Sequence, residues 1–234
     1  MPVFQLSERL AFPPARLARA DGLLAVGGDL SPQRLLLAYR MGIFPWFLQD
    51  EPILWWSPDP RLVLFPDELH VSRRLRRLIR QAKFRITADR AFEAVIRACA
   101  ETRLAEGQGT WIDTRMIDAY CRLAQMGYAH SVEAWLDGGL AGGLYGVQLG
   151  GCFFGESMFT RVSNASKVAF VSLVAFLVQH RVTLIDCQVT TQHMLGLGAR
   201  EIPRDRFLEL LAHAAQQPPE RASWYLPDKV VGRK

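Results

Sequence analysis

The chain has 234 residues, of which half are hydrophobic and 22% are charged, and its formal net charge is +5. This composition can build a sizeable buried core, so it excludes a disordered chain, a fibrous protein and a small disulfide scaffold. The longest apolar run, residues 168–178, is shorter than the roughly 18 residues that a membrane span needs. The first 20 residues contain three prolines and three arginines and do not have the pattern of a secretory signal.

Cysteine spacing and charge narrow the class of protein further. Cys99, Cys121, Cys152 and Cys187 form no CxxC pair, so neither a zinc ribbon nor a thioredoxin motif is present, and we expect no metal site. Free cysteines are typical of a reduced, cytoplasmic compartment. The isoelectric point of about 9.3 suggests an anionic partner.

Residues 1–65 are rich in proline, glycine and tryptophan, and we predict a small N-terminal domain there. Ser31 followed by Pro32 is typical of a helix start, and this helix should run over 33–41 and end at Gly42. Further elements of this domain are two aromatic segments at 43–47 and 53–56 and a short strand at 61–65.

The second predicted domain, residues 66–234, begins with a strongly basic helix capped by Ser72. Residues 72–103 hold ten Lys or Arg against three Asp or Glu, an excess (10 − 3 = +7) larger than that of the whole chain. Positions three and four apart share one helix face, so a phosphate backbone would relieve the repulsion between these cations. A solvated basic face is the alternative, about equally consistent with the pattern. The candidate phosphate-binding residues, which the family resemblance given below assigns to tRNA, are Arg73, Arg76, Arg77, Arg80 and Lys83.

The remaining elements predict an α+β fold, in which helices pack on a mixed sheet. Asp89 should cap the helix that follows the basic one, after a strand at 84–87. Residues beyond 217 should form a loosely ordered tail. The other predicted elements are a helix at 113–126, three hairpin-connected strands at 130–136, 140–148 and 152–159, a helix at 166–180, a strand at 182–189 and a helix at 205–215.

Aromatic side chains are the first candidate binding groups. Trp46 and Trp111 lie in loop-like contexts, where an indole ring can stack on a nucleobase. For any single tryptophan, a place in the core is the more common outcome. Together with the basic helix, however, these residues favour single-stranded nucleic acid, such as an RNA 3′ end.

Two apolar strands carry the candidate catalytic groups. Glu156 lies between apolar residues and could hold an amine, or it could be a structural carboxylate. Asp186 and Gln188 are two apart, so both side chains should point to one face of their strand, with Cys187 on the other face in the core. Asp186 could accept a proton from an attacking amine, and Gln188 could orient a carbonyl group.

The order of strands and helices also fits a coenzyme A-dependent N-acyltransferase. The pyrophosphate loop of that family needs two glycines, because backbone N–H groups must approach the phosphates closely. Residues 161–166, RVSNAS, contain neither glycine. The scaffold is therefore compatible with an acyltransferase, whereas the phosphate loop is not.

Seven runs, which begin with GLLAVGGDL (22–30), GIFPWF (42–47) and WWSPDPR (55–61), stand in one order between about residue 22 and residue 203. With these runs, the sequence closely resembles the bacterial leucyl/phenylalanyl-tRNA–protein transferases. One departure from the family is Gly196, where the family would have serine. This departure weakens the resemblance for the loop around Gly196, but not for the function. The runs that carry the resemblance are GLLAVGGDL (22–30), GIFPWF (42–47), WWSPDPR (55–61), GTWI (109–112), GESMF (155–159), NASK (164–167) and IDCQ (185–188).

The resemblance implies a cytoplasmic enzyme that moves leucine or phenylalanine, with methionine as a further candidate, from aminoacyl-tRNA to proteins with N-terminal Arg or Lys. The product would be marked for N-degron degradation. It also implies an acetyltransferase-like catalytic domain with a smaller N-terminal domain, no cofactor, no metal and no membrane, and we expect a monomer. The residues themselves leave two alternatives, a coenzyme A-dependent N-acyltransferase and a non-catalytic RNA-binding protein.

The resemblance also assigns roles to residues. Trp46 and Trp111 would hold the terminal adenosine, Glu156 the aminoacyl α-ammonium group, and Gln188 the ester carbonyl. Asp186 would bind and deprotonate the acceptor amine, or position groups beside the ribose, two alternatives that remain open. The substrate-binding set is completed by Phe44, Leu144, Phe153, Ser157, Met158, Phe170, Leu173 and Ile185.

Overall fold

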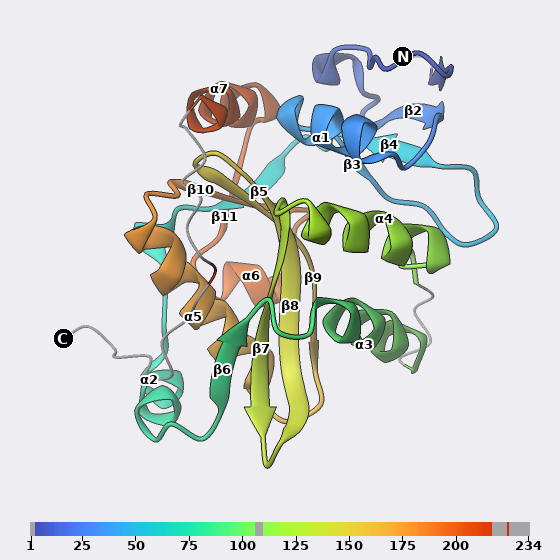
Figure 1. Cartoon of the computed structure of the whole chain (residues 1–234). Coiled ribbons are helices and arrows are strands. Elements are labelled where there is room, and N and C mark those ends of the chain that lie inside the picture. Colours follow the sequence, from blue (N-terminus) through green and yellow to red (C-terminus); the bar gives the residue numbers. More distant parts are fainter. Residues whose placement is uncertain (1–2, 106–109, 217–223, 225–234) are drawn as a thin grey trace.

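The computed structural model describes residues 3–105, 110–216 and Trp224, and it contains two β-sheets with helices packed around them (Figure 1). The smaller sheet has the strand order β1-β2-β4-β3, and the larger one the order β11-β5-β10-β9-β8-β7-β6. The predicted α+β class, with a mixed sheet and packed helices, is confirmed. None of the described helices is long and apolar enough to cross a membrane.

The small sheet is formed by the N-terminal residues and is covered by helix α1, Pro32–Arg40. The predicted start of α1 is confirmed, since the Ser31 side chain accepts a hydrogen bond from the Arg34 N–H. The two aromatic segments form neighbouring antiparallel strands. The strands are β1 (Phe4–Leu6), β2 (Leu23–Gly27), β3 (Phe44–Pro45) and β4 (Leu54–Trp56).

The large sheet contains the predicted array of three hairpin-connected strands, β7 to β9, which is confirmed. Strands β9 and β10 pair in parallel, whereas the other neighbours in this sheet are antiparallel. Strand β5, which the sequence analysis grouped with the N-terminal residues, pairs with β10 and β11 in this sheet. The strands are β5 (Arg61–Leu64), β6 (Arg85–Ala88), β7 (Ala129–Leu136), β8 (Gly139–Leu149), β9 (Cys152–Thr160), β10 (Leu184–Gln188) and β11 (Arg200–Ile202).

Helices cover both faces of the large sheet (Figure 1). Helix α5 packs on β7 and β8 from one side, and α3 and α4 pack on the other side. One hydrophobic cluster joins the α3 and α4 side to the small sheet, and a second fills the space beneath α5. The helices are α2 (Arg73–Arg80), α3 (Phe92–Ala105), α4 (Thr114–Gln125), α5 (Ala165–Gln179), α6 (Gln192–Leu195) and α7 (Arg204–Ala215).

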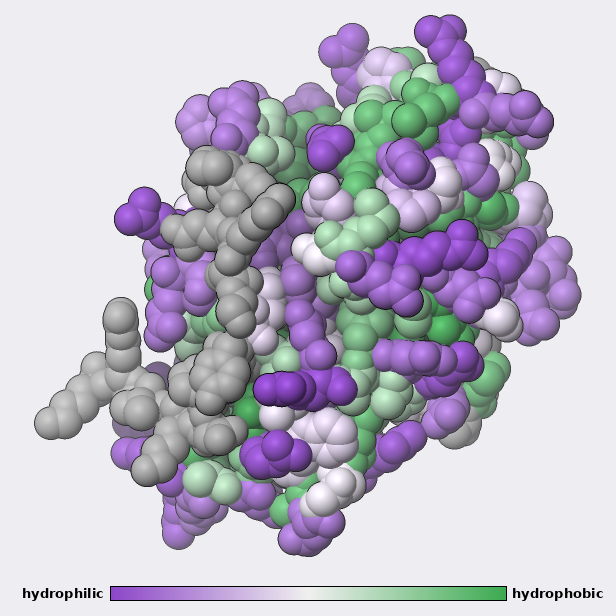
Figure 2. Space-filling view, viewed as in Figure 1, coloured by the Kyte–Doolittle hydropathy of each residue, from purple (hydrophilic) through white to green (hydrophobic). Residues whose placement is uncertain are grey.

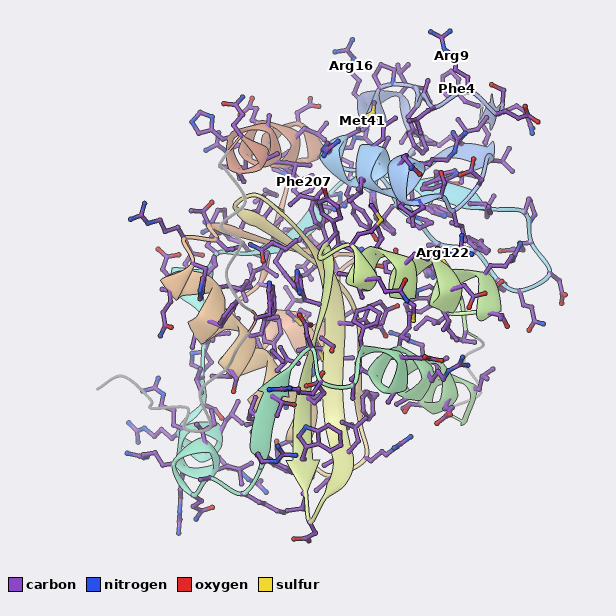
Figure 3. The ribbon with its side chains drawn as sticks, viewed as in Figure 1. Phe4, Arg9, Arg16, Met41, Arg122 and Phe207 are labelled. Carbon is purple, nitrogen blue, oxygen red and sulfur yellow. The ribbon has the colours of Figure 1, made fainter. Side chains whose placement is uncertain are left out.

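The basic helix α2 is confirmed, and its cations face solvent. Ser72 caps it by accepting a hydrogen bond from the Leu75 N–H, and Leu75 is its buried anchor. The arginines of α2 and Lys83 are exposed. Figure 3 shows the side chains of α2 projecting away from the rest of the fold. Hydrophilic side chains also dominate the rim of the face seen in Figure 2, with hydrophobic patches nearer its centre.

Three local predictions have different outcomes. Asp89 does not cap α3, which begins at Phe92: its carboxylate accepts a hydrogen bond from the Ser131 N–H and pairs with the His130 ring, both on β7. Gly196 has ordinary helical dihedral angles, and a Cβ there would meet its nearest atom at 3.4 Å, so a serine would fit. The predicted loosely ordered tail lies outside the described residues, apart from Trp224, whose ring stacks on His130 at 3.9 Å.

A glycine in β8 allows α5 to pack closely against the sheet. A Cβ on Gly142 would lie 2.6 Å from Cβ of Ala165 and 2.9 Å from the backbone nitrogen of Ser166. We expect Gly142→Ala to lower the free energy of unfolding by about 1–3 kcal/mol, because the backbone of α5 must shift. Gly139→Ala on the same strand is the control, since its Cβ would lie 3.5 Å from the nearest atom. Equal stability of the two variants in urea denaturation would contradict this explanation.

Candidate active site

A cavity of about 470 Å³ lies where the small sheet meets the large one. Its walls come from β3, the end of α3, strands β8 to β10, α5 and α6. Most of the lining is apolar, with polar groups from several elements among it, which is the usual composition of a small-molecule site. The predicted site residues that line it are Phe44, Trp46, Trp111, Leu144, Phe153, Glu156, Ser157, Met158, Phe170, Ile185 and Gln188.

Two predicted site residues do not line this cavity. Leu173 is fully buried in the cluster beneath α5, so it supports the wall from behind. Asp186 is fully buried as well and points away from the cavity. The candidate tRNA-binding residues also lie outside the cavity, on and just after the exposed helix α2.

The end of β10 differs from the predicted alternation. Its pairing with β5 shifts register between Asp186 and Gln188, and Gln188 has a positive φ of 63°. Asp186 and Gln188 therefore do not share a face: Cys187 and Gln188 both line the cavity, and Asp186 does not. The sequence analysis placed Cys187 on the far side because strict alternation assumes a strand without a bulge.

Asp186 is held by an arginine that the sequence analysis did not select. Arg61, at the start of β5, donates from Nε to Oδ1 at 2.8 Å and from Nη2 to Oδ2 at 2.6 Å. Neither side chain is accessible to solvent. The backbone N–H of Gln188 also donates to Oδ1, at 2.9 Å. Both carboxylate oxygens are thus occupied, so Asp186 fixes the bulge that directs Gln188 into the cavity.

The guanidinium group of Arg61 lies between two aromatic rings from distant parts of the chain. Its carbon is 4.8 Å from the ring centre of Phe44 and 4.5 Å from that of Phe207. Figure 3 shows Phe207 beneath α7, next to the small domain. Arg61 also donates to the carbonyl oxygen of Gly42 at 3.2 Å. These contacts stabilise a buried cation that would otherwise be costly.

Glu156 lines the cavity and lies within a network of hydrogen bonds. Its Oε1 accepts from the Tyr39 hydroxyl and from Nε2 of Gln188, each at 2.8 Å, and its Oε2 accepts from the Tyr120 hydroxyl at 3.0 Å. The two hydroxyl groups are also hydrogen-bonded to each other. Tyr39 comes from α1 and Tyr120 from α4, so the network connects the small domain, α4 and the large sheet.

Burial raises the pKa of Glu156 from its usual value of 4.5 to about 7, and the charge of Asp186 adds to this effect. The hydrogen bonds from Tyr39, Tyr120 and Gln188 oppose it. Three oxygen–oxygen contacts join the carboxyl group and the two hydroxyls, which together supply only two hydrogens. A protonated Glu156 would supply the third. The network therefore has room for one extra proton near neutral pH.

Two tryptophans are among the aromatic groups that line the cavity. The rings of Trp46 and Trp111 are 5.9 Å apart and nearly perpendicular, at 83°. A base cannot lie between both rings in this arrangement, so it would stack on one face or separate the rings. The guanidinium carbon of Arg103 lies 3.8 Å from the ring centre of Trp111, and the group also donates to the Ser157 hydroxyl. Among the described residues, no group of three His, Cys, Asp or Glu could hold a metal ion.

Several of these residues gave little signal in the sequence. Arg61 stands at the end of the run WWSPDPR, but nothing local shows that it is buried. Tyr39 and Tyr120 have the spacing of ordinary apolar helix positions, and Arg103 is one of many arginines. Their roles depend on contacts with residues far away along the chain.

An apolar cavity lined by a buried carboxyl group with a raised pKa is typical of an enzyme site. The family model described as leucyl/phenylalanyl-tRNA protein transferase matches residues 63–212, and the model of the N-terminal domain of that transferase matches residues 28–59. The chain therefore belongs to the leucyl/phenylalanyl-tRNA–protein transferase family, and the resemblance found in the sequence is confirmed.

Curated relatives in this family match nearly the whole chain. The transferase of Syntrophobacter fumaroxidans is 61% identical over 96% of both chains. That of Desulfatibacillum aliphaticivorans is 58% identical, and that of Anaeromyxobacter sp. 59% identical, each over 97% of both chains. Among solved structures, L-PGS from Bacillus licheniformis is 10% identical with a TM-score of 0.42, and the match covers 72% of this chain and 53% of that one.

The buried ion pair predicts that a double variant loses less unfolding free energy than the single variant that removes only the cation. Arg61→Met should lower the free energy of unfolding by about 3–5 kcal/mol, because it leaves Asp186 buried without a cation. Adding Asp186→Asn should restore part of that loss, since it removes the unpaired charge and keeps an acceptor for the Gln188 N–H. Chemical denaturation of both variants measures this, and simply additive losses would show that the pair is not coupled.

Glu156 should make stability depend on pH. A carboxyl group with a higher pKa in the folded state stabilises that state fully below the unfolded pKa, here about 4.5, and the contribution is lost as pH rises through about 7. Relative to Glu156→Gln, the wild-type protein should therefore lose about 3 kcal/mol of unfolding free energy between pH 4.5 and pH 8. Denaturation of both proteins across this range measures the difference. A difference that does not change with pH would contradict the raised pKa.

Proposed function

We propose that this enzyme transfers leucine or phenylalanine, with methionine as a third candidate, from aminoacyl-tRNA to the N-terminal Arg or Lys of acceptor proteins. The observation that carries the proposal is the cavity itself, in which apolar walls lead to the Glu156–Gln188 pair. Near-full-length similarity to curated transferases of this name supports the same activity. The reaction needs no ATP, because the aminoacyl ester is already activated.

The apolar wall is suited to the transferred side chain. Leu144, Phe153, Met158, Phe170 and Ile185 line it, from β8, β9, α5 and β10. A pocket of this kind separates ligands that differ by a methylene by only about 1–3 kcal/mol, so it can accept both leucine and phenylalanine. A flexible methionine in the wall helps to fit either shape.

In the proposed reaction, the acceptor α-amine attacks the ester carbonyl, an amide bond forms, and the bond from the carbonyl carbon to the ribose oxygen breaks. Glu156 takes the proton that the amine loses and returns it to the leaving ribose oxygen, so protons balance. Its raised pKa of about 7 suits both steps at neutral pH. This assignment moves the basic role from Asp186 to Glu156, because Asp186 is enclosed by Arg61.

Gln188 and Asp186 then have positioning roles. One N–H of the Gln188 amide is used by Glu156, which leaves its oxygen and a second N–H for the amine and the ester carbonyl. Asp186 keeps Gln188 in place through the bulge at the end of β10. Holding the two reactants in line can itself contribute about 7–11 kcal/mol to lowering the barrier.

The RNA part of the substrate would occupy two surfaces. The terminal adenosine would stack on Trp111 or Trp46 at the cavity, with the Arg103 guanidinium already on the Trp111 ring. The exposed cations of α2 would hold phosphates of the tRNA body. We also propose a monomer acting in the cytoplasm, because one chain supplies every group of the proposed site and tRNA is a cytoplasmic molecule.

Transfer from Phe-tRNA to an Arg-initiated peptide, without coenzyme A, tests the proposal. We expect turnover by the wild-type protein and a loss of about 10²–10⁴-fold in kcat for Glu156→Gln, which keeps the shape of the side chain and removes the base. Glu133→Gln is the matched control: Glu133 is a buried carboxyl group with a raised pKa, but it lies outside the cavity.

Two results would contradict the proposal. Transfer that requires added acyl-coenzyme A would favour an N-acyltransferase, and tRNA binding without turnover would favour a non-catalytic RNA-binding protein. Turnover by Glu156→Gln at the rate of Glu133→Gln would reject the role of Glu156 as a base. Comparing Leu-, Phe- and Met-tRNA in the same assay gives the order of preference.

A further inference from the structure

A second cavity, of about 380 Å³, lies between the start of α2, the start of α5 and helix α6. We call it the basic cleft. Its lining includes the side chains of His70, Arg74, Lys167 and His193. None of the described residues that line it is Asp or Glu. Arg74 and Lys167 are cations at neutral pH, and a cavity with two cations and no carboxylate favours an anion.

The remaining polar groups of the basic cleft suit phosphate oxygens. Ser72 uses its hydroxyl oxygen to cap α2, and the hydroxyl hydrogen remains able to donate. Asn164 and Gln192 add amide groups. Hydroxyl and amide donors together with Arg and Lys are the groups that usually contact phosphates of nucleic acids.

The basic cleft adjoins the candidate active site. His193, on the short helix α6, lines both cavities, and Ser72 at the far wall begins the arginine-rich helix α2. An RNA strand whose last nucleoside occupies the active-site cavity can therefore pass through the cleft to the exposed arginines.

We propose that the basic cleft binds a backbone phosphate of the unpaired RNA end, within the two nucleotides that precede the esterified adenosine. The inference rests on the proposed function. Of the two substrates in that reaction, the acceptor carries a cationic Arg or Lys at its N-terminus, which Arg74 and Lys167 would repel. The RNA strand is the anionic one, so the charge of the lining selects it.

The experiment compares three Phe carriers of increasing length: adenosine without a phosphate, the dinucleotide CpA and the trinucleotide CpCpA. For the wild-type protein, KM should fall as phosphates are added. For Lys167→Met and Arg74→Met, KM with Phe-CpCpA should rise about tenfold each, because each variant removes one cation that binds the phosphate. KM with Phe-adenosine should stay unchanged in both variants.

Three controls make the comparison specific. Arg122→Met removes an exposed cation of α4 that lines neither the cleft nor the active-site cavity, so it should leave KM with Phe-CpCpA unchanged. Lys167→Arg keeps the charge and should keep most of the wild-type KM. The slope of log KM against log salt concentration should become smaller by about 0.7 for each phosphate that the variant no longer neutralises.

The cleft assignment would be overturned if Lys167→Met left KM with Phe-CpCpA unchanged. It would also be overturned if this variant raised KM with Phe-adenosine and KM with Phe-CpCpA equally. Binding of CpCpA without an attached amino acid, measured by calorimetry, separates this result from a failure of the proposed function. If the wild-type protein transferred nothing but bound CpCpA through Lys167, the cleft would stand and the transfer proposal would fail. If it transferred from all three carriers without any dependence on Lys167 or Arg74, only the cleft assignment would fail.

Discussion

The buried ion pair between Arg61 and Asp186 is the interaction on which the rest of this structure depends. It joins β5 to β10 in the large sheet, and the Arg61 guanidinium also contacts Phe44 and the Gly42 carbonyl of the small domain and Phe207 of α7. Two fully buried charges are tolerated because each oxygen of the carboxylate has a donor and the cation has aromatic faces on both sides. One contact therefore fixes the relative position of both sheets around the cavity.

The same pair gives the two buried carboxyl groups of the site different properties. Asp186 is paired with a cation and acts as a fixed support for the bulge at Gln188. Glu156 has hydroxyl and amide donors but no cation bonded to it, so burial raises its pKa into the neutral range. Neighbouring carboxyl groups in different surroundings commonly divide roles in this way, one remaining charged and the other exchanging a proton. Charge also distinguishes the second cavity, whose lining includes Arg74 and Lys167 and, among the described residues, no carboxylate.

Local sequence signals predicted the elements whose causes are local. Ser31 and Ser72 cap helices where the capping pattern indicated, and the glycine turns separate β7, β8 and β9 as expected. The prediction for Asp89 was wrong because the capping pattern does not reveal a competing partner on β7. The alternation rule failed for Asp186 and Gln188 for a related reason: a bulge depends on the partner strand, and β5 lies more than 120 residues away along the chain.

By itself, the sequence determined the family, the α+β class, the basic helix and eleven of the residues that line the cavity, since long runs of specific residues and hydrophobic periodicity are readable without neighbours. Only the tertiary structure decided which carboxyl group faces the cavity and which is enclosed by Arg61. It also decided that Tyr39 and Tyr120 meet at Glu156, and that α2, α5 and α6 enclose a cationic cleft. These properties arise from burial and from contacts between distant segments, and neither burial nor such contacts can be inferred from any single stretch of the chain.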